Sequence, residues 1–134
     1  MSQKTQEPTF HVPLLPHDKP GGRPERRFSS EELAHPLLPQ LQDGDMLIRM
    51  EEDATGLFRE DDLLLVRHAP QAKPEIGMIL VTLYDDQFWP EKVVAKGPEG
   101  PLLETPPEAG APGSHYRVER IGYVLWSGRE WPAP

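Results

Sequence analysis

Short apolar runs separated by polar turns dominate the chain from residue 45 onward. Apolar runs of about four to eight residues bounded by turn residues are typical of buried β-strands. The predicted strands are Asp45–Met50, Asp61–His68, Gly77–Tyr84, Gln87–Lys96, Gly100–Thr105 and Tyr116–Gly128. Five or six short strands with turn signals between them predict an all-β domain.

Three details of this pattern constrain how the strands pair. The turn at Asp85-Asp86 joins its two flanking strands into a predicted β-hairpin. Pro90 has no backbone N–H, so part of the second hairpin strand is expected at an edge or a bulge. Gly122 is expected to kink the last strand. We expect the last strand, over Tyr116–Trp126, to pack against Gly77–Tyr84 in one β core.

The first 44 residues predict an arm outside this core. Seven of the 17 prolines lie here, and each removes a backbone hydrogen-bond donor. One short helix is predicted, with an N-cap at Ser29-Ser30, acids at Glu31 and Glu32, and an end at His35-Pro36. The sequence therefore predicts three regions: a flexible N-terminal arm with a short helix (1–44), a β domain (45–128) and a tail (129–134).

The charge balance argues against binding of nucleic acid by this chain. Twenty-two acidic and 14 basic residues give a net charge of −8, which repels phosphate backbones. The arginines at positions 23, 26 and 27 fit a solubilising role on the arm. No stretch approaches the roughly 20 apolar residues of a membrane span, and no secretory leader is visible, so we expect a cytoplasmic protein.

Metal and cofactor sites are not expected either. The chain has no cysteine, which excludes disulfides, thiol nucleophiles and thiolate ligands. Its histidines share no metal-ligand spacing; they are His11, His17, His35, His68 and His115. Trp89, Trp126 and Trp131 could form a binding patch, but tryptophans of a small β domain are more typical of a core or an interface.

Four segments occur in an order that resembles the peptidase domain of the LexA repressor family, which includes UmuD-like proteins and phage repressors. They are Glu60–Val66, Ile76–Val81, Glu91–Val94 and Arg120–Val124, and the resemblance covers roughly residues 45 to 127. It implies a small, irregular, β-barrel-like domain. It also implies a peptide-bond hydrolase in which a lysine deprotonates a serine nucleophile, usually to cleave the protein's own arm.

The resemblance places Ala54 at the position of the serine and Lys92 at the position of the base. Alanine has no group that attacks a carbonyl. Three carboxylates directly precede it (residues 51–53), and a carboxylate near Lys92 would favour the charged amine. The catalytic dyad is therefore interpreted as dismantled.

Alternatives remain open at each of these positions. A register shift of one residue would present the Thr55 hydroxyl as the nucleophile. Ala54 could also be an engineered replacement of a natural serine, made to keep the protein uncleaved. Lys92 could instead pair with an acid such as Glu91 or Asp53. Gly21-Gly22, two residues before Pro24, resembles the cleavage position of the family's arm, but it is equally typical of a flexible linker.

The resulting hypothesis is a regulatory and self-association domain that acts through protein partners in stress response or phage repression, and that forms a homodimer. Two alternatives are an active self-cleaving serine- or threonine-lysine peptidase and a UmuD-like DNA polymerase accessory protein. The second alternative is favoured by the comparable chain length and because the sequence shows no helix-turn-helix pattern of the kind that a DNA-binding head would carry. Neither the hypothesis nor its alternatives requires a cofactor.

Overall fold

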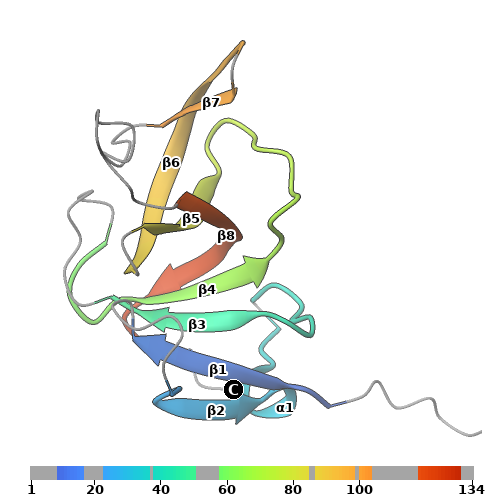
Figure 1. Cartoon of the computed structure of the whole chain (residues 1–134). Coiled ribbons are helices and arrows are strands. Elements are labelled where there is room, and N and C mark those ends of the chain that lie inside the picture. Colours follow the sequence, from blue (N-terminus) through green and yellow to red (C-terminus); the bar gives the residue numbers. More distant parts are fainter. Residues whose placement is uncertain are drawn as a thin grey trace, which may run out of the picture.

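Eight strands and one short helix make up the described part of the chain (Figure 1). The computed structural model describes residues 9–16, 23–36, 38–50, 58–84, 87–98, 100–103 and 118–130. Its elements are β1 (His11–Pro16), β2 (Arg26–Ser29), α1 (Ser30–Leu33), β3 (Met46–Arg49), β4 (Leu63–His68), β5 (Ile79–Tyr84), β6 (Gln87–Gly97), β7 (Gly100–Leu103) and β8 (Val118–Gly128). The prediction of an all-β domain is confirmed.

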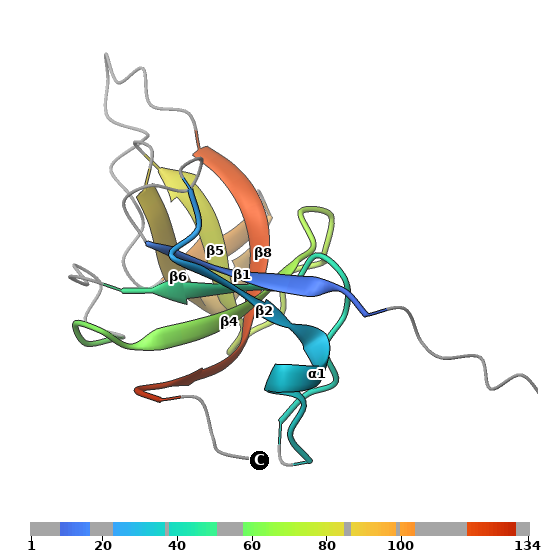
Figure 2. The ribbon, with the colours of Figure 1, turned by 90° about the horizontal axis from the view of Figure 1, so that it is seen from below.

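The strands form one mixed sheet in the order β2-β1-β3-β4-β8-β5-β6-β7. Every neighbouring pair is antiparallel except β1 and β3, which run parallel. The long strand β8 is strongly curved and joins the two halves of the sheet (Figure 2). The sheet is nevertheless open, whereas a barrel-like closure was expected. In the described residues its outer strands, β2 and β7, have four residues each and do not pair with one another.

Strand β4 lies at the centre of the sheet and is buried on both faces. Leu64 and Val66 belong to one hydrophobic cluster, with Ile48 and Val81. The alternate residues Leu63 and Leu65 belong to a second cluster, which contains Leu33 of α1. Because successive side chains of a strand point to opposite faces, burial on both faces explains why β4 is continuously apolar.

The N-terminal segment contributes two strands to the same sheet, which corrects the expectation of an arm over residues 1–44. Leu14 and Leu15 of β1 lie opposite Leu47 and Ile48 of β3, and Val12 is fully buried. β2 then pairs with the outer side of β1. Burial of the apolar residues of β1 outweighs the donors lost at its prolines. Position 45 is therefore not a boundary of the sheet.

The short helix α1 begins and ends as predicted. Ser29 is the N-cap: its hydroxyl accepts from the Glu32 N–H at 3.2 Å, and its own N–H donates to the Glu32 carboxylate at 3.0 Å. This reciprocal capping box satisfies two otherwise unpaired donors. The backbone hydrogen bond from Ser29 lowers the pKa of Glu32. The helix ends at Leu33, just before His35-Pro36.

The predicted hairpin and the predicted packing of the last strand are both confirmed. β5 pairs with β6 on one side and with β8 on the other. Pro90 lies opposite Val81, in the half of β6 that β7 does not reach, since β7 pairs only from Val93 onward. Gly122 lies beside a register shift between β5 and β8, so the predicted irregularity is also present.

Candidate functional site

Of the predicted catalytic residues, Lys92 alone lies within the described part of the chain. It is a residue of β6 and lies opposite Ile79 of β5. Ala54, Thr55 and the Gly21-Gly22 pair lie outside the described residues, as does Asp53. The distance between Lys92 and the proposed nucleophile turn therefore stays a prediction.

The Lys92 side chain is exposed. Among the described residues it takes part in no ion pair, so the suggested pairing with Glu91 is wrong. Glu91 is only 1% exposed and accepts a hydrogen bond from the Trp89 indole N–H at 3.3 Å. Neighbouring residues of an extended strand point to opposite faces, which explains why Glu91 and Lys92 do not meet.

Lys92 belongs to a row of exposed side chains on β6, with Val94 and Lys96; this row together with the exposed Ile76 of the adjoining turn is called the β6 surface. Lys92, Val94 and Lys96 alternate with buried or half-buried residues. Residues 75–78 run beside this strand: Gly77 donates to the Val93 carbonyl at 2.8 Å, and Lys96 forms an ion pair with Glu75 at 2.7 Å. That hydrogen bond from Lys96 lowers the pKa of Glu75. Val94 is 47% exposed and Ile76 is 64% exposed, so the surface combines two amines with apolar area.

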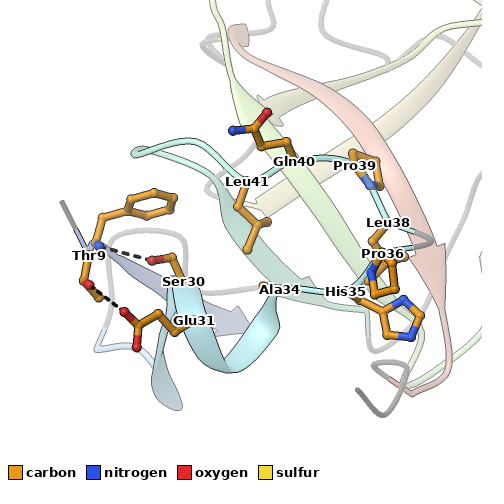
Figure 3. A pocket seen from close by; sticks show the side chains of 11 residues that line it. Thr9, Ser30, Glu31, Ala34, His35, Pro36, Leu38, Pro39, Gln40 and Leu41 are labelled. Carbon is orange, nitrogen blue, oxygen red and sulfur yellow. Dashed lines mark hydrogen bonds between the residues drawn. The ribbon is translucent and has the colours of Figure 1, made fainter. Parts of the chain in front are cut away.

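A pocket of about 590 Å³ lies at the other end of the sheet order, beside β1 and α1. It is lined by Thr9 and Phe10, by Ser30 and Glu31 of α1, and by Ala34–Pro36 and Leu38–Leu41. Thr9, Ser30 and Glu31 gather on one side, and His35, Pro36 and Leu38 on the other (Figure 3). No local sequence signal indicated this pocket, because three separate segments form it.

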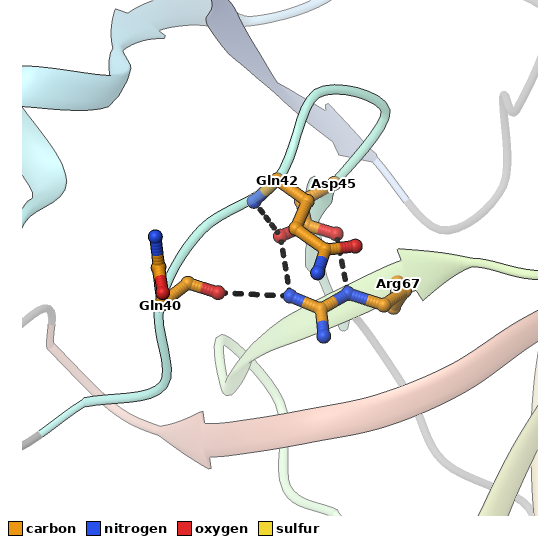
Figure 4. A network of polar contacts seen from close by, with 4 residues as sticks. All are labelled: Gln40, Gln42, Asp45 and Arg67. Atoms are coloured by element: carbon orange, nitrogen blue, oxygen red, sulfur yellow. Dashed lines mark hydrogen bonds and ion pairs between the residues drawn. The ribbon is translucent and has the colours of Figure 1, made fainter. Parts of the chain in front are cut away.

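The pocket segment that follows α1 is held by a nearly buried ion pair (Figure 4). Arg67 of β4 binds both carboxylate oxygens of Asp45, at 3.1 and 3.2 Å, and also donates to the Gln40 carbonyl at 2.9 Å. The Gln42 N–H donates to Asp45 at 2.8 Å. Asp45 is 1% exposed, and its hydrogen bonds raise the pKa of Arg67. The ion pair thus fixes the loop between α1 and β3.

The remaining candidate groups give no further site. No group of three histidine, aspartate or glutamate residues that could hold a metal occurs in the described ranges. Trp126 is partly buried against the second hydrophobic cluster, Trp89 is partly buried on β6, and Trp131 lies outside the described residues. Within those same limits, no helix is long and apolar enough to cross a membrane.

Comparison with known proteins adds no assignment. No family model matches the chain, and no curated protein matches it. The described residues offer two candidate binding sites. One is the β6 surface, with its exposed amines and apolar side chains, and the other is the pocket that carries the Glu31 carboxylate.

Proposed function

We propose that the chain is a LexA-like regulatory and self-association domain whose serine-lysine dyad is dismantled. It acts through protein partners, in stress response or phage repression. The segments that resemble the family lead into or lie within β4, β5, β6 and β8. These four strands are neighbours in the sheet, in the order β4-β8-β5-β6, so that the last strand of the chain lies between β4 and β5. This arrangement supports an order of strands like that of the family, in which the lysine follows a hairpin turn.

The exposure of Lys92 is the observation that carries the proposal. An amine accepts the proton of a nucleophile only when it is neutral, and lysines that act as bases are desolvated or placed near other cations. Lys92 is exposed, and Ala54 offers no hydroxyl. Both features favour a domain that binds without cleaving.

The first test is the mass of the purified chain after incubation between pH 7 and pH 10. We expect the unmodified chain to keep its mass of 15.2 kDa at every pH, because no hydroxyl is present at position 54. Ala54→Ser is expected to restore slow cleavage near Gly21-Gly22 that accelerates as pH rises. Adding Lys92→Ala is expected to slow this cleavage about 100-fold or more.

Lys96→Ala in the same Ala54→Ser background is the matched control, since Lys96 is an exposed lysine of the same strand. It is expected to leave the cleavage rate unchanged. Cleavage by the unmodified chain that disappears with Thr55→Val would replace this proposal with a threonine peptidase. If the Lys92 and Lys96 variants lost cleavage equally, Lys92 would not be the base of the dyad.

Self-association is proposed to use the β6 surface. Ile76 and Val94 are the most exposed large apolar side chains of the described residues, and a two-fold contact would bury both pairs. Sedimentation at micromolar concentration is expected to give twice the 15.2 kDa mass of one chain. Ile76→Asp with Val94→Asp is expected to give the monomer, whereas Gln87→Asp, at the start of β6, leaves the dimer intact. A monomeric unmodified chain would contradict the proposed homodimer.

A further inference from the structure

We propose that the pocket beside α1 binds an organic cation, namely an amine, amidine or guanidine carried on an apolar body. The pocket volume of about 590 Å³ lies in the range of small-molecule sites, roughly 300 to 1,000 Å³. This site is separate from the β6 surface, because α1 follows the edge strand β2 whereas β6 lies near the opposite edge of the sheet. The inference does not depend on the proposed function.

The charges that line the pocket select a cation. Glu31 is the one acidic side chain among the lining residues; His35 is the one basic side chain among them, and no lysine or arginine lines the pocket. One carboxylate oxygen of Glu31 accepts from the Thr9 hydroxyl at 3.2 Å, and its second oxygen has no hydrogen-bond donor among the described residues. An N–H cation can therefore bind this carboxylate directly, in a charge-assisted hydrogen bond. The net charge of −8 of the whole chain favours the approach of a cation as well.

The rest of the lining suits an apolar body. Phe10, Leu38, Leu41 and the two prolines of the loop supply carbon surface. In Figure 3 Glu31 points toward Thr9 on one side of the pocket, and Pro36, Leu38 and Pro39 lie on the other side, so a ligand that spans the pocket would meet the carboxylate at one end and carbon at the other. A cation that stacks on an aromatic ring already occurs nearby, where the Arg26 guanidinium lies 4.3 Å from the centre of the Phe28 ring.

The walls of the pocket are held in place by hydrogen bonds within the chain. Ser30 and Phe10 are linked twice: the Ser30 N–H donates to the Phe10 carbonyl at 2.8 Å, and the Phe10 N–H donates to the Ser30 hydroxyl at 3.4 Å. The capping box at Ser29 fixes α1, and Arg67 fixes the loop through Gln40. A pocket held in this way binds without the entropic cost of ordering its walls.

The test is a titration of the ¹⁵N-labelled full chain, followed by NMR, with benzamidine and with its neutral isostere benzamide. Benzamidine is expected to give saturable shifts at the amides of Thr9, Phe10, Ser30 and Glu31. Benzamide is expected to bind at least about tenfold more weakly, because it cannot form the charge-assisted hydrogen bond. Equal binding of the two probes would overturn the proposal.

Three variants separate the pocket from general attraction of cations to an acidic chain. Glu31→Gln is expected to weaken benzamidine about tenfold and to leave benzamide unchanged. Ala34→Trp fills the exposed mouth of the pocket and is expected to abolish the binding of both probes. Glu119→Gln removes the same charge from an exposed site on β8 and is expected to change nothing. Shifts that persist in Glu31→Gln, or that weaken equally in Glu119→Gln, would overturn the proposal.

A second titration distinguishes the sources of such a cation. The probe is the tripeptide acetyl-Leu-Arg-Leu-amide, which carries a guanidinium on a peptide backbone. Tighter binding than benzamidine at the same amides would support the proposal and assign the cation to a side chain of a protein. Weaker binding, with benzamidine still selective over benzamide, would support the proposal and assign the cation to a small molecule.

Discussion

Replacing Arg67 by leucine is expected to lower the free energy of unfolding by about 3 to 5 kcal/mol. The Asp45 carboxylate is 1% exposed, and Arg67 is its cationic partner, so the substitution would leave a buried charge with only the hydrogen bond from the Gln42 N–H among the described residues. The Gln40 carbonyl would lose its donor in the same step. Urea denaturation followed by tryptophan fluorescence measures the change, and the melting temperature should fall on the order of 10 °C.

Arg49→Leu is the matched control. Arg49 forms an ion pair with Glu25 at 3.0 Å, but both side chains are more than a third exposed. Exposed pairs are worth about 1 kcal/mol at most, because water and salt screen them. Equal losses of stability in the Arg67 and Arg49 variants would contradict the role assigned to the buried pair.

Gly122→Ala is expected to destabilise the fold by about 3 kcal/mol or more, or to prevent folding. A Cβ atom at this position would collide with the Arg67 carbonyl oxygen and would lie 2.9 Å from the Ala69 nitrogen. Both atoms belong to the backbone, so no flexible side chain can move aside. The strands β4 and β8 would have to separate where His68 and Gly122 are paired. Soluble yield and urea denaturation report the outcome.

Gly77→Ala tests whether any added methyl group has this effect. Gly77 has a φ of 90°, but a Cβ there would meet nothing within 4 Å. The expected cost is therefore only the backbone strain of an alanine, about 1 to 2 kcal/mol. If Gly122→Ala lowered the free energy of unfolding no more than Gly77→Ala does, this would contradict the close approach of β8 to β4 at Gly122.

The sequence by itself determined the elements whose signals lie close together along the chain. The capping box needs only Ser29 and Glu32, three residues apart, and the hairpin needs only two apolar runs joined by Asp85-Asp86. The continuous run Leu63–Val66 likewise indicated a buried strand, although its burial on both faces became known only from the structure. In each case the stabilising contact is local, so the residue types are enough to predict it.

The tertiary structure alone decided which distant segments meet. The segment Val12–Leu15 reads as a proline-rich arm, yet it becomes an interior strand of the sheet because β3 and β2 pair with its two sides. Asp45 and Arg67 are unremarkable in the sequence, and only the pairing of β3 with β4 brings their elements together. The pocket and the exposure of Lys92 likewise depend on how segments that are distant in the sequence pack together. Burial and ion pairing depend on neighbours across the sheet, and apolar patterning along one strand leaves the identity of those neighbours open.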